Sequence, residues 1–158
     1  MIIPLYKPSL SRLEKKNVMR CLDDNWISSK GGFIKKFEKN FKKKFNYKFA
    51  SVTTNGTTAL HLALLALDIK KSDEVIVPNL TYVAPVNAVK YMGAKPVLTD
   101  VNSKTWLMDI DEIKKKINYK TKAIILVHLY GSSYNFKEIN KIKKKYNIKI
   151  IEDCAEAI

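Results

Sequence analysis

The sequence contains little cysteine, glycine or arginine, and each shortage excludes a class of protein. Two cysteines, Cys21 and Cys154, in 158 residues are too few and too isolated for a disulfide framework or a metal site. Five glycines exclude a collagen-like chain, and a hydrophobic content of 46% excludes intrinsic disorder. No uncharged apolar run approaches the roughly 18 residues of a membrane helix, and the N-terminus lacks a signal-peptide pattern. We therefore expect a soluble, cytoplasmic protein with a buried core.

The net charge of +14 comes almost entirely from lysine, because only Arg12 and Arg20 among the 29 basic residues are arginine. Surfaces that read bases or clamp phosphates usually recruit arginine for its two-pronged guanidinium group. The positive charge gathers in residues 35–48, 114–122 and 137–149, where the apolar residues recur at helical spacing. We interpret the lysines as the solvated faces of helices. A nucleic-acid partner is disfavoured, and a basic polyanion-binding α/β domain is the weaker alternative to an enzyme.

Residues 1–48 are predicted to form an N-terminal helical segment. Ser11, followed by Glu14 three residues later, matches a capping box. Phenylalanine then recurs every fourth residue from Phe33 to Phe45, a spacing that places the rings on one face of a helix.

From residue 49 to residue 158, strand-like and helix-like segments alternate without a linker. The expected strands are residues 49–54, 74–78, 95–100, 122–129 and 148–153, and the expected helices are residues 55–68, 81–92, 109–117 and 135–146. The strands are short and largely apolar, as in a sheet that is buried on both faces. The alternation predicts an α/β fold with three layers, in which helices cover both faces of a mainly parallel sheet.

Ligands of such sheets bind beyond the carboxyl ends of the strands. The turn at Gly56 and Thr57 leads into a helix, whose free backbone N–H groups and positive dipole end suit a phosphate group. The alternative is plain N-capping by Asn55 or Thr57 without a ligand. The turn matches neither a P-loop nor the G-x-G-x-x-G fingerprint, which disfavours ATP and NAD.

Other strand-end residues suit a flat, cationic ligand. The carboxylate of Asp153 emerges from a strand end and needs a cationic partner, which the protonated ring nitrogen of a cofactor would supply. A helix N-cap or a loop hydrogen bond would also satisfy it. Tyr82 could stack on a flat ring or pack in the core. His61 is most simply a core or helix-packing residue, and His128 could line the cleft, although no nucleophile accompanies it.

These segments resemble the DegT/StrS family of pyridoxal-phosphate-dependent nucleotide-sugar aminotransferases. The resemblance covers essentially the whole chain, and it rests on six motifs at family-like spacing, namely IPLYKPSL, WISSKGGFIKKFEKNF, TTNGTTALHLALLAL, DEVIVPNLTYVAPVNAVKYMGAKPVLTDV, TKAIILVHLYG and IEDCAEAI. It implies that residues 49–158 are the first part of a cofactor-binding large domain of fold type I, like that of aspartate aminotransferase. No metal is implied.

The resemblance also assigns roles to individual positions. The cofactor-binding residues that it implies are Gly56, Thr57, Thr58, Tyr82, Asp153 and Glu156. The first three would hold the phosphate of pyridoxal 5'-phosphate, the tyrosine would stack on its ring, and the aspartate would pair with the ring nitrogen. Glu156 would lie beside the ring, where glutamate is typical of the perosamine-forming enzymes. Trp26, Ser28 and Ser29 match a segment near the sugar-nucleotide site.

The implied reaction moves an amino group from glutamate to a nucleotide-linked 4-keto-6-deoxy sugar, for amino-sugar and surface polysaccharide biosynthesis. In this family the active site lies at the interface of a homodimer. The lysine that forms the Schiff base lies beyond Ile158, together with the rest of the large domain and the small domain. We therefore expect this chain alone to be inactive. A same-family sugar 3-dehydratase, which has histidine in place of that lysine, is the alternative.

Overall fold

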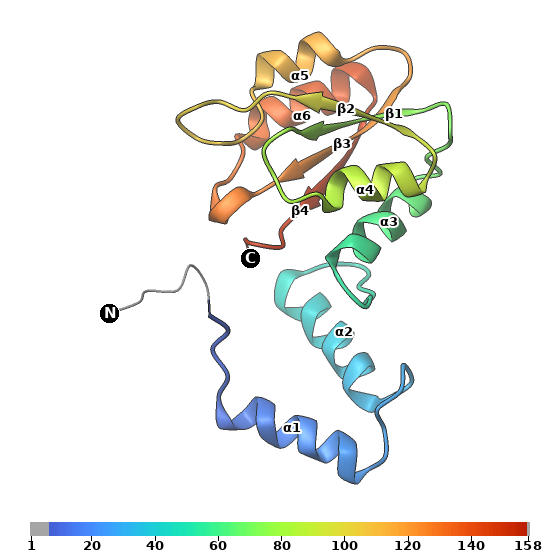
Figure 1. Cartoon of the computed structure of the whole chain (residues 1–158), viewed down its shortest axis with the longest axis vertical. Helices are drawn as coiled ribbons and strands as arrows, with labels where there is room; N and C mark the ends of the chain where they lie inside the picture. The colour runs from blue at the N-terminus through green and yellow to red at the C-terminus, as the bar shows by residue number, and fades with distance from the viewer. Residues whose placement is uncertain (1–6, 158) are drawn as a thin grey trace. The chain divides into compact units, whose positions relative to one another are not determined.

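A computed structural model describes residues 7–157 of the chain (Figure 1). The chain divides into two compact units, Met1–Val52 and Thr53–Ile158. Among the described residues, no helix is both long enough and apolar enough to cross a membrane.

The first helix of the first unit, α1 (Arg12–Asp23), begins at the predicted capping box. The side chain of Ser11 accepts a hydrogen bond from the amide of Leu13 at 3.0 Å, and the Glu14 carboxylate accepts one from the amide of Ser11 at 2.6 Å. Both bonds satisfy amide groups that have no acceptor within the helix. The capping-box prediction is confirmed.

The second helix, α2 (Gly32–Phe45), carries the predicted phenylalanine row. The ring centroids of Phe37 and Phe41 lie 5.7 Å apart, and those of Phe41 and Phe45 lie 4.6 Å apart. The helix ends at Asn46, whose φ of 55° is left-handed and whose amide donates to the carbonyl of Lys42. Asparagine tolerates this conformation better than most residues and here stops the helix.

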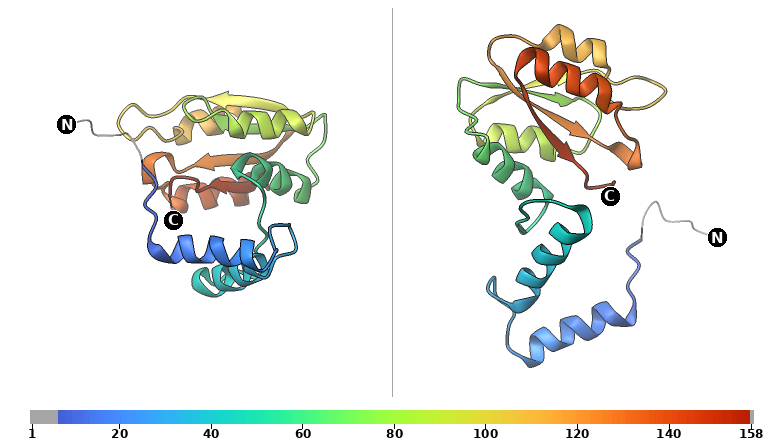
Figure 2. Two further views of the ribbon diagram at one scale, coloured as in Figure 1. Left: turned by 60° about the horizontal axis from the view of Figure 1, so that its bottom comes forward. Right: turned by 180° about the vertical axis from the view of Figure 1, so that it is seen from behind.

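The second unit alternates helices with parallel strands. Its elements are α3 (Gly56–Ala66), β1 (Glu74–Pro78), α4 (Ala84–Tyr91), β2 (Lys95–Thr99), α5 (Ile110–Lys116), β3 (Thr121–Val127), the 3-10 turn η1 (Leu129–Gly131), α6 (Phe136–Tyr146) and β4 (Lys149–Asp153). The sheet has the strand order β2-β1-β3-β4, and each neighbouring pair is parallel. Helices lie on both sides of the sheet, α3 and α4 on one and α5 and α6 on the other (Figures 1 and 2).

Strand β3 separates two hydrophobic clusters. Ile125 points to one side, where it joins the buried leucines and alanines of α3 and α4. Ile124 points to the other side, among the buried isoleucines of α5 and α6. Because successive side chains of a strand alternate between faces, a strand that is apolar at every position must be covered twice. The predicted three-layer α/β fold is confirmed.

One predicted strand is wrong. Residues 49–54 form no strand, so the described part of the chain has four strands and not five. The amide of Val52 donates to the Glu38 carboxylate at 3.1 Å and pairs with no neighbouring strand. Propensity alone does not make a strand, because its backbone groups need a partner strand to bond with.

A buried carboxylate fastens the amino-terminal edge of the sheet. Glu74, at the start of β1, is only 7% exposed. Its two oxygens accept hydrogen bonds from Lys95 Nζ at 3.0 Å and from Asn118 Nδ2 at 2.7 Å. The bond from Asn118, together with the ion pair to Lys95, lowers the pKa of Glu74 against the opposing effect of burial. The carboxylate therefore joins β1 to β2 and to the loop before β3.

Replacing Glu74 with Gln should lower the free energy of unfolding by about 1 to 3 kcal/mol at neutral pH. The glutamine NH₂ group would then face one of the two donors, Lys95 Nζ or Asn118 Nδ2, that the carboxylate now accepts from. The lowered pKa fixes the pH dependence. The stabilisation is complete above the pKa of an unfolded glutamate, about 4.3, and is lost as the pH falls through the lower folded-state pKa. Urea unfolding of both proteins between pH 7 and pH 3 measures the difference, which should shrink in acid.

The matched control is Asp111→Asn, which removes an exposed ion pair to Lys114 and should change the stability little. An equal loss in both variants, or a difference for Glu74→Gln that does not depend on pH, would contradict the assignment.

Candidate active site

The carboxyl ends of the four strands lie at one edge of the sheet, since all neighbouring pairs are parallel. The helices that connect parallel strands run in the opposite direction, so they begin at this same edge. Polar residues gather there: the side chains of Asn79, after β1, and Asp100, after β2, are hydrogen-bonded to each other. This edge is where the sequence predicted a ligand.

The start of α3 carries a capping box, and two of its backbone amides have no acceptor within the helix. Asn55 Oδ1 accepts the amide of Thr58 at 2.9 Å, and the Thr58 hydroxyl donates to the Asn55 carbonyl at 2.8 Å. The cap expected as an alternative therefore exists, formed by Asn55 and not by Thr57. The amides of Gly56 and Thr57 lie in the first turn of α3 and have no acceptor inside the helix, so they can still bind an anion.

The space in front of Gly56 is open. A Cβ atom added at this glycine would meet no heavy atom within 4 Å. Its backbone can thus be approached closely by a ligand, and a side chain there would occupy that space. The positive end of the α3 dipole favours a negative group at this point.

Asp153 ends β4 on the same side of the sheet as α3. Its neighbour two residues earlier, Ile151, belongs to the cluster that packs against α3 and α4, and α3 contacts β4 directly. The Asp153 side chain is partly buried, and Oδ1 accepts the amide of Ala155 at 3.1 Å. The loop hydrogen bond considered from the sequence is present, and it uses only one of the two carboxylate oxygens.

Tyr82 does not pack in the core, because it is 78% exposed. It lines a pocket of about 400 Å³, whose other residues are Leu80, Thr81, Trp106, Leu129, Tyr130 and Glu156. The structure thus brings Tyr82 and Glu156, both predicted beside the cofactor ring, to one pocket. The pocket is largely apolar and aromatic, with a single carboxylate.

Two aromatic residues of this pocket have left-handed backbones. Trp106 has a φ of 59° and Tyr130 a φ of 50°, and their rings meet edge to face with centroids 6.2 Å apart. Bulky residues adopt this conformation rarely, and such residues cluster at functional sites. The amide of Tyr130 donates to Glu156 Oε2 at 2.7 Å, which helps to hold the turn. Sequence reasoning missed Trp106, since no periodicity marks a loop residue.

His128 lies on the other side of the same edge. It is 5% exposed and lines a second pocket of about 460 Å³ together with Glu152, Cys154 and Glu156. Burial, followed by the nearby charges of Glu152 and Asp153, raises the pKa of the Cys154 thiol.

The remaining predicted residues fall elsewhere. His61 packs against Tyr91 of α4, with ring centroids 5.7 Å apart, as a helix-packing residue. In the first unit, Trp26 and Ser28 line a pocket of about 770 Å³, whereas Ser29 is not among its lining residues.

Residues 8–158 match the sequence pattern of the DegT/DnrJ/EryC1/StrS aminotransferase family. The chain belongs to this family. It is 53% identical over 155 residues to a GDP-perosamine synthase from Escherichia coli O157:H7. The aligned residues make up 98% of this chain and 43% of that protein. The expected resemblance is confirmed, and the chain is a partial-length homologue of a nucleotide-sugar aminotransferase.

Solved structures of the family agree in fold. An aminotransferase from Psychrobacter cryohalolentis superimposes with a TM-score of 0.90 at 38% identity, over 96% of this chain and 38% of the other. A GDP-4-keto-6-deoxymannose-3-dehydratase with a trapped PLP-glutamate geminal diamine gives a TM-score of 0.89 at 32% identity, over 98% of this chain and 42% of the dehydratase chain. The family depends on pyridoxal phosphate. This chain spans less than half the length of these relatives.

Replacing Asn55 with Ala should lower the free energy of unfolding by about 1 kcal/mol, because the amide of Thr58 loses its acceptor. Gly56→Ala is the matched control one residue later. Its Cβ meets no neighbour and alanine is the better helix former, so no loss is expected. Urea unfolding of the 158-residue chain measures both, and similar losses in both variants would refute the capping role of Asn55.

Proposed function

We propose that this chain supplies the cofactor-holding part of a pyridoxal-phosphate-dependent aminotransferase that acts on a nucleotide-linked 4-keto-6-deoxy sugar, with glutamate as the amino donor. Its second unit is the first part of the large domain. The observation that carries the proposal is that a capped helix start, a strand-end carboxylate and an exposed aromatic ring all lie at the carboxyl edge of the sheet. The 53% identity to a GDP-perosamine synthase supports the choice of substrate class.

The residues present fit the cofactor group by group. Its phosphate is an anion, and the amides of Gly56 and Thr57 face open space at the positive end of α3. Its ring nitrogen is cationic when protonated, and Asp153 offers a carboxylate oxygen on the same side of the sheet. Its flat ring would be covered by the exposed ring of Tyr82.

Each residue then has a physical role. When bound, pyridoxal phosphate supplies an electron sink that stabilises negative charge at the carbon that carries the amino group. Asp153 holds the proton on the ring nitrogen and so maintains that sink. Thr58 and Asn55 hold the start of α3 in place, which orients the two free amides toward the phosphate. Glu156 lies beside the ring and fixes the turn at Tyr130.

Trp26, Ser28 and Ser29 of the first unit are proposed to contact the sugar nucleotide. The pocket that Trp26 and Ser28 line has room for part of such a ligand. A homodimer is the proposed working assembly, and the proposed Schiff-base lysine belongs to the portion of the relatives that this chain does not span.

A sugar 3-dehydratase is the second candidate, because a GDP-4-keto-6-deoxymannose-3-dehydratase also matches 98% of the chain. The fold does not separate the two, as both TM-scores are near 0.9. Sequence favours the aminotransferase: identity is 53% to the synthase and 32% to the dehydratase.

The proposal can be tested in a chimera in which this chain replaces the matching 155-residue segment of the Escherichia coli protein. The chimera should bind pyridoxal phosphate and transfer the amino group of glutamate to a GDP-linked 4-keto-6-deoxy sugar. Failure of a folded chimera to bind the cofactor would refute the proposed site.

In this chimera, Asp153→Asn should lower kcat on the order of 10²-fold, because a neutral amide does not hold the ring-nitrogen proton. The visible absorbance of the bound cofactor should change with it. Asp111→Asn, a surface substitution, is the control and should leave both unchanged. Full activity in Asp153→Asn would rule out the assigned role.

The chimera also tests the phosphate site. Gly56→Val places a branched side chain in the open space and should weaken pyridoxal phosphate binding by about 10-fold or more, given the loss of charge-assisted hydrogen bonds. Asp111→Asn, the surface substitution used above, is the control and should leave the cofactor affinity unchanged. Circular dichroism checks that both variants fold, and equal cofactor affinity in the two would contradict the site.

A further inference from the structure

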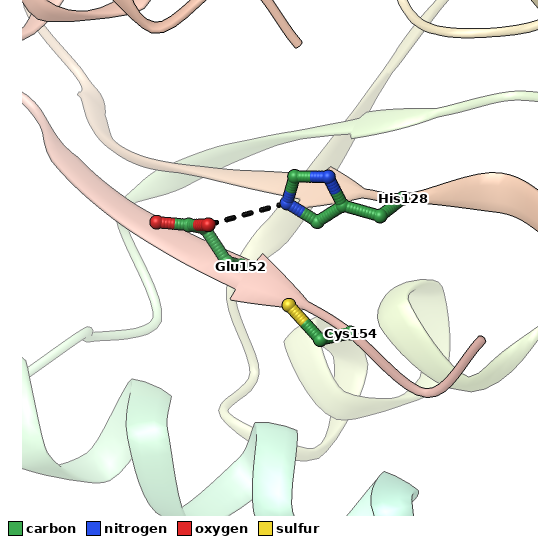
Figure 3. A group of neighbouring side chains, drawn as sticks. All are labelled: His128, Glu152 and Cys154. Atoms are coloured by element: carbon green, nitrogen blue, oxygen red, sulfur yellow. Dashed lines mark hydrogen bonds and ion pairs between the residues drawn. The ribbon is translucent and has the colours of Figure 1, made fainter. Parts of the chain in front are cut away.

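Three potential metal ligands converge at the ends of β3 and β4 (Figure 3). They lie on the side of the sheet that faces α6, since His128 stacks on Phe136 at the start of that helix. Val127 pairs with Asp153 in the parallel register, so His128 comes level with Cys154. Glu152 and Cys154 are two residues apart and therefore share one face of the strand. One ligand atom from each of the three residues lies within 4.8 Å of the others.

The imidazole is held in a fixed orientation before any ligand binds. His128 is 5% exposed. Its ring meets the edge of Tyr134 at 5.6 Å and stacks on Phe136 at 6.1 Å between centroids. Nε2 points toward Glu152 Oε2, 3.2 Å away (Figure 3). Packing thus immobilises the imidazole with Nε2 directed at Glu152.

The other two ligands are reachable from solvent. The Glu152 side chain is 45% exposed and Cys154 is exposed. Both line the pocket of about 460 Å³ that also contains His128. An ion can therefore enter from this pocket, and the two exposed side chains can adjust to it.

We propose that His128, Glu152 and Cys154 form a binding site for a zinc ion, with a water molecule from the pocket in the fourth position. Imidazole nitrogen, carboxylate oxygen and thiolate sulfur are the three ligand types that Zn²⁺ takes in proteins. Tetrahedral coordination at the usual metal distances puts ligand atoms about 3.3 to 3.8 Å apart. The His128–Glu152 pair at 3.2 Å is within about 0.1 Å of this range, and the sulfur needs a shift of about an ångström or less to reach it.

None of the three ligands is a residue of the proposed cofactor site, although Glu156 lines the pockets of both, and the zinc site does not depend on the proposed function. Asp153 lies between two of the ligands in sequence, so its side chain points to the opposite face of β4. The ion would therefore bind on one face of the end of β4, and the proposed cofactor would contact Asp153 on the other face. Sequence spacing gave no sign of it, because one ligand comes from a different strand.

The simpler interpretation is that the contact between His128 and Glu152 only fastens β3 to β4, with Cys154 nearby by chance. The two interpretations differ in the role of the sulfur. The 158-residue chain has only two cysteines, so thiolate coordination can be assigned by substitution without interference from others.

The test uses Co²⁺ as a spectroscopic probe and Zn²⁺ as its competitor, with the purified 158-residue chain free of pyridoxal phosphate. Bound Co²⁺ should give a thiolate charge-transfer band and the intense visible bands of tetrahedral cobalt, and one equivalent of Zn²⁺ should remove them. Zn²⁺ should also raise the thermal unfolding temperature of the chain.

Cys154→Ser should abolish the charge-transfer band and weaken Zn²⁺ binding by at least about 10-fold. Glu152→Gln should weaken Zn²⁺ binding to a similar extent but should keep the charge-transfer band, because the thiolate ligand is still present. Both changes are at exposed positions and should preserve the fold. Cys21→Ser, the only other cysteine substitution available, is the matched control and should behave like the unaltered chain. Absence of Zn²⁺ binding, or equal binding in Cys154→Ser and the unaltered chain, would overturn the proposal.

Discussion

The arrangement of this protein depends on the central position of β3. This strand pairs with β1 on one side and β4 on the other, both in parallel, and its apolar side chains enter both hydrophobic clusters. Parallel pairing requires a helix between successive strands, and those helices cover both faces. As a result, every strand ends at the same edge, and every polar residue placed after a strand is delivered to one side of the molecule.

The sequence was most informative where local chemistry decides the structure. The Ser11 and Glu14 pair predicts a cap that forms from neighbouring residues alone, and the apolar strands predict their own burial. Residues 49–54 have strand-like composition, but whether they form a strand depends on a pairing partner, which composition does not reveal. For the same reason the extent of each element could be predicted only to within a few residues.

The candidate site was predictable in part. Gly56, Asp153 and Tyr82 occupy positions next to strand or helix ends, which sequence patterns locate. The contact between the rings of Trp106 and Tyr130 depends on left-handed backbone turns in two separate loops. The ligands of the proposed zinc site likewise come from the ends of two strands. Such meetings follow from the register between distant segments, and no local pattern in one sequence encodes them.

Glu156 lines both pockets at the carboxyl edge and also accepts the amide of Tyr130. A change of this residue would therefore alter three surroundings at once: the aromatic pocket, the histidine pocket and the turn that joins them. Trp106, by contrast, lines the aromatic pocket and not the histidine pocket. A change at Trp106 would therefore reshape the aromatic pocket without altering the lining of the histidine pocket.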